Sequence, residues 1–176
     1  EDLLHDVLVR LLDGCGAERT VVLVISTSDS LLYLLGSSDD PTACRLPVER
    51  DNHPEVEEVL TQGQEMYVEE AGGALPGSEV FREALRRRRI GALWAVPLRW
   101  RGEAFGVLEV CFASSVRLEE PTSQLVRQAA ALIGPILRNS ELFASLREQT
   151  RKRVAAELEP GRQDKMLQKY DDFFNR

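Results

Sequence analysis

The sequence is poor in the residue types that most often carry catalysis or bind metals. It has two histidines and three cysteines among 176 residues, and Cys15, Cys44 and Cys111 lie far apart. Without a CxxC pair or a mixed Cys/His cluster, neither a zinc site nor a disulfide framework is indicated. The patterns GxxxxGK[ST], HExxH and GxSxG are missing as well. We therefore expect no enzyme activity, no catalytic residues, no metal and no cofactor.

Aromatic residues are also scarce, at 6%, so Leu, Val, Ile and Ala must fill the interior. A hydrophobic content of 43% over this length is enough to bury one substantial core. Acidic residues outnumber basic ones, 29 to 22, and the net charge of −7 disfavours nucleic acid as a partner. No apolar run approaches the roughly 20 residues that cross a bilayer. We expect a cytoplasmic segment without a membrane span, cut from a longer protein because the sequence starts without Met.

Hydrophobic periodicity predicts an α+β fold. The two longest strand patterns form a probable hairpin around Arg101 and Gly102, and a second hairpin is expected around the polar turn 28–30. The order of elements is not a βαβ repetition, which favours an antiparallel sheet with helices. The expected helices are 2–13, 55–60, 78–88 and 121 to about 158, and the expected strands are 20–26, 31–35, 45–49, 65–69, 92–100 and 103–112.

The last predicted helix carries a narrow apolar stripe with alternating steps of four and three residues, as in a coiled coil. Pro135 lies inside it and predicts a kink. We expect this helix to pair with a second copy of the chain, so that the protein is a homodimer. The alternative is a surface helix that packs back on its own domain. The stripe residues assigned to the dimer are Leu132, Ile136, Asn139, Phe143, Leu146 and Thr150.

Three segments together resemble the GAF family. The stretch GALWAVPLRWRGEAFGVLEVCFASS (91–115) is similar to the central hairpin of GAF domains. The stretch SQLVRQAAALIGPILRNSELFASLREQTRKR (123–153) resembles their closing helix, and LPVERDNHPEVEEVLTQGQEMYVEE (46–70) resembles their middle segment. The resemblance implies a central antiparallel sheet of five or six strands flanked by helices, with a long C-terminal helix. Residues 1–153 would form this sensory domain.

The resemblance also implies a function. GAF domains of bacterial two-component systems bind small ligands and pass a signal through the last helix to a PAS or histidine kinase module. The alternative is a ligand-free dimerisation and spacer module. The N-K-F-D-E set of cyclic-nucleotide binders and the Cys-His dipeptide of bilin binders are absent. The residues expected to contact a ligand, each of which could instead be plain packing, are Arg45, His53, Tyr67, Phe81 and Trp94.

The tail DKMLQKYDDFFNR (164–176) resembles the helical start of a PAS domain, so residues 154–176 are assigned to a linker and the beginning of that module. The alternative is a disordered or helical terminus. Some GAF domains reduce free methionine sulfoxide with clustered cysteines, but Cys44 has no cysteine nearby that could resolve it.

The run Arg86 to Arg89 predicts a solvated helix end, where the positive charges complement the helix dipole. An anionic partner or nucleic acid would be the alternative ligands of this run. His53 is expected to be a turn residue beside Pro54, with a pocket contact or a haem ligand as the alternatives. His5 is expected to be an exposed helix residue.

Overall fold

The computed structural model describes residues 2–26, 29–70, 78–140 and 150. The chain divides into two compact units, Glu1–Pro135 and Ile136–Arg176. The first unit contains the whole sheet and is the part in which the candidate site lies. Within the described residues, no helix is both long enough and apolar enough to cross a membrane.

A six-stranded antiparallel sheet forms the centre of the first unit. Its spatial order is β3-β2-β1-β6-β5-β4. This confirms the predicted α+β class and the strand count of five or six. The strands are β1 (Arg19–Ile25), β2 (Leu32–Ser37), β3 (Leu46–Val48), β4 (Met66–Glu69), β5 (Ala92–Trp100) and β6 (Glu103–Phe112).

Both predicted hairpins are present. Strand β1 pairs with β2, and β5 pairs with β6 through the turn at Arg101 and Gly102. The register of β5 and β6 shifts between Leu98 and Arg99, so Arg99 pairs with Ala104 while Leu98 pairs with Gly106. A bulge of this kind bends the strands locally and changes the direction of nearby side chains.

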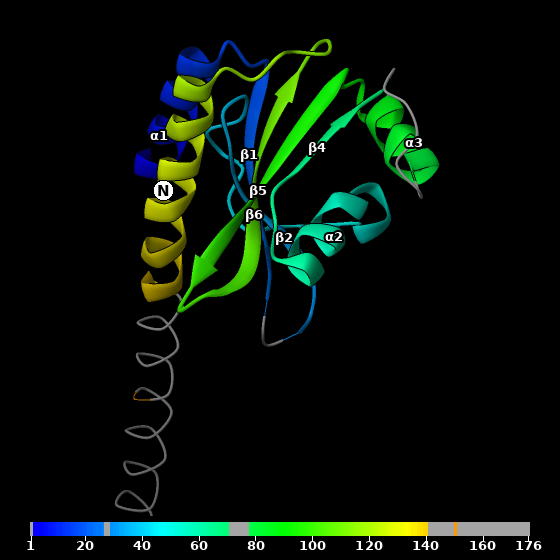
Figure 1. Cartoon of the computed structure of the whole chain (residues 1–176). Helices are drawn as coiled ribbons and strands as arrows, with labels where there is room; N and C mark the ends of the chain where they lie inside the picture. Colours follow the sequence, from blue (N-terminus) through cyan, green and yellow to red (C-terminus); the bar gives the residue numbers. More distant parts are fainter. Residues whose placement is uncertain (1, 27–28, 71–77, 141–149, 151–176) are drawn as a thin grey trace, which may run out of the picture. The chain divides into compact units, whose positions relative to one another are not determined.

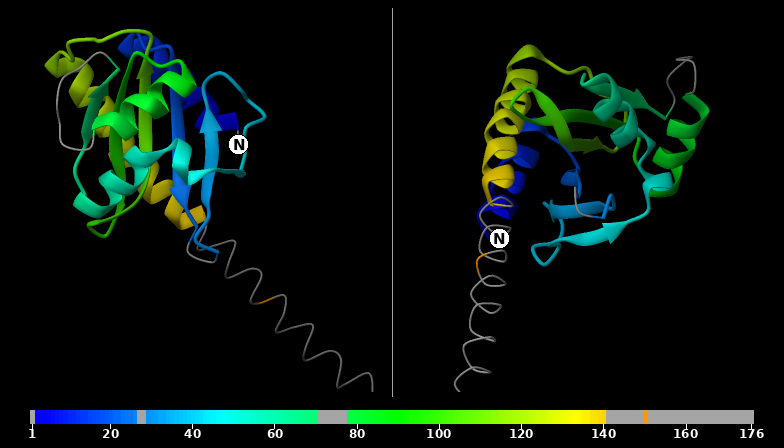
Figure 2. Two further views of the ribbon diagram at one scale, coloured as in Figure 1. Left: turned by 90° about the vertical axis from the view of Figure 1, so that its right-hand side faces the viewer. Right: turned by 90° about the horizontal axis from the view of Figure 1, so that it is seen from below.

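Helices cover both faces of the sheet (Figures 1 and 2). Helix α1 (Asp2–Cys15) lies on one face beside the last helix, which begins at residue 120. Helices α2 (Pro54–Gln62) and α3 (Ser78–Arg88) lie on the opposite face, and a short 3-10 turn, η1 (Arg50–Asn52), precedes α2. The predicted helix and strand segments match these elements to within two or three residues at each end.

The sheet is apolar on both faces because it is covered on both. On the α2 side, Val21, Leu23 and Val107 pack with Val56 and Val59 of α2. Since side chains alternate along a strand, Val22 and Leu108 point to the opposite face, and both are fully buried. On that face Thr20 Oγ1 donates a hydrogen bond to Leu8 O of α1 (2.8 Å).

The last helix carries two apolar stripes. Val126, Ala130 and Ile133 are buried and follow the three- and four-residue spacing of one helix face. Leu125 and Leu132, on a different face, are 41% and 68% exposed. Residues 120–135 are helical in the first unit, and 136–140 and 150 are helical in the second. The predicted end near residue 158 lies outside the described residues.

The last helix approaches β5 so closely at Gly134 that no side chain fits there. A Cβ atom at this position would lie 2.7 Å from the carbonyl oxygen of Arg99 and 3.0 Å from its backbone nitrogen. Both neighbours are backbone atoms of a paired strand, so they cannot rotate away. The glycine therefore sets the distance between helix and sheet.

We expect Gly134→Ala to destabilise the protein, against the helix propensity of alanine. On an exposed helix the change would add up to about 1 kcal/mol to the free energy of unfolding. Here the overlap should lower it by about 1–3 kcal/mol. Urea unfolding measures the sign. Ala131→Gly, at an exposed position of the same helix, gives the propensity term alone, and a stabilised Gly134→Ala protein would contradict the close contact.

Candidate functional site

Glu109 lies at the centre of the sheet, in the middle of the apolar strand β6. Its side chain is fully buried. On its own strand, Val107 and Cys111 share its face, and on the neighbouring strand Ala95 is its direct partner. A carboxylate at this depth has no water to solvate it, so it must have charged or hydrogen-bonding partners.

The start of α2 supplies two of these partners. His53 is the N-cap residue, and Pro54 follows at the first helical position, where its missing N–H costs nothing. Glu55 is buried because it lies one turn before Val59, on the side of α2 that packs on the sheet. The first turn of a helix favours an acidic residue, since the helix dipole is positive there.

The end of α3 supplies the third partner, Arg88. The helix closes with Arg89 in the left-handed conformation (φ 57°), and Ile90 N donates to Leu85 O (2.9 Å). This is the Schellman arrangement, usually made with glycine. Arg88 follows Leu85 and Phe81 on the buried side of the helix, and its side chain is only 11% exposed.

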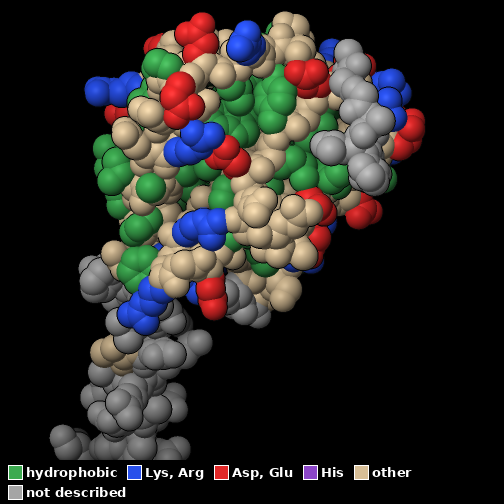
Figure 3. All heavy atoms as spheres, in the orientation of Figure 1, with side chains coloured by type: hydrophobic (Ala, Val, Ile, Leu, Met, Phe, Trp, Pro, Cys, Tyr) green, Lys and Arg blue, Asp and Glu red, His purple; other side chains and the backbone are tan. Residues whose placement is uncertain are grey.

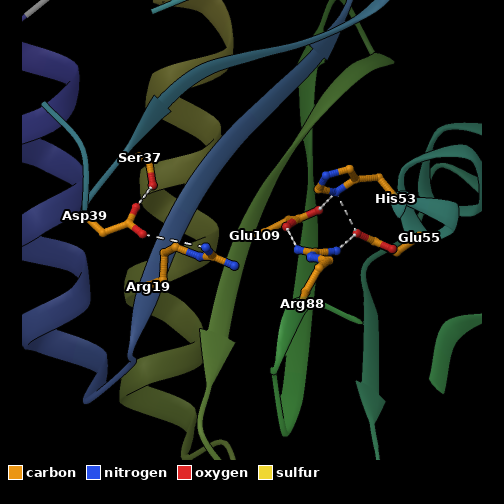
Figure 4. A network of polar contacts seen from close by, with 7 residues as sticks. All are labelled: Arg19, Ser37, Asp39, His53, Glu55, Arg88 and Glu109. Carbon is orange, nitrogen blue, oxygen red and sulfur yellow. Dashed lines mark hydrogen bonds and ion pairs between the residues drawn. The ribbon is translucent and has the colours of Figure 1, made fainter. Parts of the chain in front are cut away.

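These four residues, His53, Glu55, Arg88 and Glu109, form one connected group, here called the buried quartet (Figure 4). Arg88 Nη1 donates to Glu55 Oε1 (2.5 Å), and Arg88 Nη2 donates to Glu109 Oε2. His53 Nδ1 lies 3.2 Å from Glu55 Oε1 and 3.3 Å from Glu109 Oε1. With the hydrogen on Nδ1, His53 donates to both carboxylates. The quartet thus joins α2, α3 and the middle of the sheet.

The four groups shift one another's pKa values. Burial lowers the pKa of His53, but its hydrogen bonds to Glu109 and Glu55 outweigh burial and raise the pKa above the ordinary 6.5. Burial and the charge of Glu109 raise the pKa of Glu55. Burial also opposes ionisation of Glu109, yet the charge of Arg88 outweighs it and holds the pKa of Glu109 well below its usual range. With one proton on the pair His53 and Glu55, the quartet carries no net charge.

The same donors form the only candidate metal site among the described residues. One donor atom each of His53, Glu55 and Glu109 can be chosen so that all lie within 4.8 Å of one another. Arg88 already binds both carboxylates, and its guanidinium charge repels a second cation. Although burial opposes it, the charge of the two carboxylates raises the pKa of Arg88, so this positive charge is permanent. The chemistry of the site therefore favours a buried ion-pair network over a metal centre.

Comparison with known proteins identifies the family. The family model described as the GAF domain matches residues 1–137. The chain belongs to the GAF family. No curated protein matches the sequence.

Solved GAF structures share the fold. The GAF domain of a two-component sensor histidine kinase from Bacillus halodurans has a TM-score of 0.60 and 12% identity, over 82% of this chain and 99% of that one. The GAF domain of an Acinetobacter phosphoenolpyruvate-protein phosphotransferase has 0.60 and 14%, over 79% and 84%. A GAF domain/HD domain protein from Geobacter sulfurreducens has 0.58 and 15%, over 80% and 93%. At these identities the likeness concerns the fold.

The five residues predicted to contact a ligand are divided between the two faces of the GAF sheet. His53 is in the buried quartet, and Phe81 of α3 packs against the cluster of Leu85 and Leu93 on the same face. Tyr67 and Trp94 are cross-strand partners on the opposite face. Arg45 is exposed and stacks on the Tyr33 ring (5.6 Å). The structure therefore places His53 and Phe81 on the α2 and α3 side of the sheet, and not the other three.

Tyr67 and Trp94 have structural partners on the side of the last helix. Tyr67 Oη donates to Val116 O (2.8 Å) and accepts from Val116 N (3.0 Å). The guanidinium of Arg127 stacks on the Trp94 ring (5.7 Å). These contacts join β4 and β5 to the segment that leads into the last helix and to that helix itself.

Sequence reasoning missed three of the four members of the quartet. The prediction of a solvated arginine run holds for Arg86, Arg87 and Arg89, which are exposed, and is wrong for Arg88. Residue 88 stands seven positions after Phe81 and three after Leu85, so helical spacing could have placed it on the buried side. The sign for Glu109 was a single carboxylate inside the apolar run GVLEVCF.

The predicted dimer stripe is only partly described. Leu132, Ile136 and Asn139 are exposed in the single chain, as residues that are to contact a second copy must be. Thr150 is helical and exposed. Phe143, Leu146 and the proposed PAS segment, 154–176, lie outside the described residues.

Replacing Arg88 should test whether the quartet holds the fold together. In Arg88→Leu two buried carboxylates lose their shared counter-charge, and we expect the free energy of unfolding to fall by about 3–5 kcal/mol. Arg87→Leu breaks an exposed ion pair with Glu83 and should cost at most about 1 kcal/mol. Urea unfolding at neutral pH compares them. Equal losses would show that Arg88 is no more than a surface residue.

The shared proton predicts a pH dependence. Because the folded-state pKa of His53 is raised, its contribution to stability is complete below pH 6.5 and is lost as pH rises through the folded value. The stability difference between the wild type and His53→Asn should therefore shrink as the pH rises above 6.5 in urea unfolding. A difference that is constant or grows with pH would refute the assignment.

Proposed function

We propose that this chain is the regulatory sensory domain of a signal-transduction protein. It binds a small ligand on the α2 and α3 side of the sheet and relays the change through a dimeric last helix to an output module in the same chain. The family supports this role. Relatives of the same fold occur in a sensor histidine kinase, in a phosphotransferase and beside an HD domain, so one fold serves several outputs. A PAS or histidine kinase module is the output proposed here.

The observation that carries the relay is the second apolar stripe of the last helix. Val126, Ala130 and Ile133 already satisfy the domain's own core. Leu125 and Leu132 are left exposed, and Figure 3 shows hydrophobic side chains along the edge formed by α1 and this helix. In the second unit Ile136 is also exposed, at 56%. One stripe of this helix is covered by its own domain, and the other is exposed. The same helix of a second copy of the chain carries an identical stripe and can cover the exposed one.

The ligand is proposed to meet the buried quartet, because this group connects the two helices of that face to the sheet centre. Binding can move these helices only if the ligand prefers one of their arrangements. One observation favours the alternative, a ligand-free dimerisation and spacer module: His53, Glu55, Arg88 and Glu109 already satisfy one another. A spacer would need no more than this.

Catalysis is not part of the proposal. Burial, reinforced by the charge of Glu109, raises the pKa of Cys111 to about 12, so its thiolate does not form at neutral pH. Burial raises the pKa of Cys15 as well. A thiol that stays protonated is a poor nucleophile.

A single charge in the open stripe should separate the dimer. Leu132→Glu places a carboxylate where the two helices meet, and we expect native mass spectrometry to find mainly monomer at concentrations where the wild type is dimeric. Ala131→Glu adds the same charge on the same helix, at an exposed position that faces away from the stripe, and should leave the dimer intact. A wild-type protein that is monomeric would refute the relay.

The same spectra test the ligand. A sensory domain that retains a metabolite gives a mass above that of the polypeptide, and mild collisional activation releases the extra mass. Arg88→Leu should lose this species if the quartet contributes to binding. A wild-type protein without bound mass, which also shows no shift in melting temperature with any member of a metabolite library, would favour the spacer.

A further inference from the structure

One residue of β5, Arg99, contacts elements on both faces of the sheet. Its guanidinium donates from Nη2 to Gly63 O and from Nη1 to Gly102 O (3.0 Å). Its backbone lies against Gly134 of the last helix, where an added Cβ would be 2.7 Å from Arg99 O. The side chain therefore reaches the α2 layer while the main chain supports the helix on the other side.

On the α2 side, the contact is with the end of the helix. Gly63 is the C-cap of α2, in the left-handed conformation (φ 63°), and its N–H donates to Val59 O (2.8 Å). A positive side chain at this point meets the negative end of the helix dipole and the last free carbonyls. The start of α2 is held by the buried quartet. Helix α2 is thus fixed at both ends, by the quartet at its N-terminus and by Arg99 at its C-terminus.

On the other side, the contact is with the weakest point of the last helix. Pro135 follows Gly134 and has no N–H, so the carbonyl four residues earlier lacks its helical partner. Residue 136, the next in the chain, begins the second unit. A displacement of β5 at Arg99 therefore acts on the helix where the backbone resists bending least.

We propose that Arg99 is the positioning residue that couples α2 to the last helix. It transmits a movement of α2 through its own backbone, at the register shift between β5 and β6, to Gly134. The proposal rests on the proposed function only in taking the last helix as the output. The alternative is that Arg99 only stabilises the β5–β6 turn through its hydrogen bond to Gly102 and does not transmit a movement of α2 to the last helix.

The test disturbs α2 and follows the last helix in the full chain. Val59→Ala removes a buried contact of α2, and hydrogen exchange followed by mass spectrometry reports the amides of residues 131–138. We expect Val59→Ala to speed their exchange at least about fivefold, relative to peptides from β1, in the wild-type background. In Arg99→Met, which keeps the aliphatic stem but no donors, the same change should have less than a twofold effect.

Arg101→Met is the matched control. It removes another exposed arginine, beside the same turn and stacked on the Trp100 ring (5.6 Å), and should leave the response to Val59→Ala intact. Arg99→Lys, which keeps the cation but carries its donors on one nitrogen instead of a planar fork, should give an intermediate response and serves if Arg99→Met does not fold. Equal responses with and without Arg99, or no response in the wild type, would overturn the coupling.

A further measurement separates the coupling from the proposed dimer and ligand. The wild type, Val59→Ala, Arg99→Met and the double variant Val59→Ala/Arg99→Met can be measured again in the Leu132→Glu background, where the proposed dimer is absent. A response that persists there and depends on Arg99 establishes the coupling within one domain, even if the dimer or ligand proposal fails. A response that disappears with the dimer places the coupling between copies and refutes the role of Arg99 within the domain.

Discussion

The structure depends on the guanidinium of Arg88 between two buried carboxylates. Glu109 stands where a sheet covered on both faces has no water, and Glu55 is buried under α2. Either carboxylate alone would be too costly to ionise at this depth. The arginine makes both tolerable, and in doing so it fixes where α3 ends and where α2 begins. Three elements that are distant in sequence are held together by one charge, which explains why α2 and α3, both short, keep defined positions over the sheet.

Much of the fold could be predicted from the sequence because it depends on local periodicity. The strands β5 and β6, their turn and α3 were placed almost to the residue, since alternating or helical apolar patterns extend over their whole length. The buried quartet could not be found in this way. Its members are separated by 33 and 21 positions along the chain, and each has an ordinary local reading: Arg88 in a run of arginines, Glu55 in an acidic first turn. Only Glu109, alone in an apolar strand, contradicted its local pattern.

The closure of the quartet decides what a ligand there must offer. Each charged group of the quartet already has a partner within the protein. A ligand can therefore bind one of these groups only by taking the place of its present partner. An anion would compete with Glu55 and Glu109 for Arg88, while a cation would compete with Arg88 for the two carboxylates. The first exchange would release the start of α2 from α3, and the second would free the end of α3. The charge of such a ligand would therefore determine which helix is released, and only an anion would act on α2, whose other end contacts Arg99.

The contact at Gly134 limits the ways in which the last helix can move. A shift along its axis by one turn, about 5.4 Å, would bring residue 130 or 138 to the place of Gly134. Ala130 and Arg138 both carry a Cβ, and at that place a Cβ overlaps the backbone of Arg99. Sliding by a turn, one of the known switching movements, is therefore blocked on this face. A tilt about Gly134 is not, because it keeps the glycine against the strand while the helix changes direction beyond it. The contact at Gly134 is thus compatible with a tilt of the last helix about this residue, next to Pro135, and not with a slide along its axis.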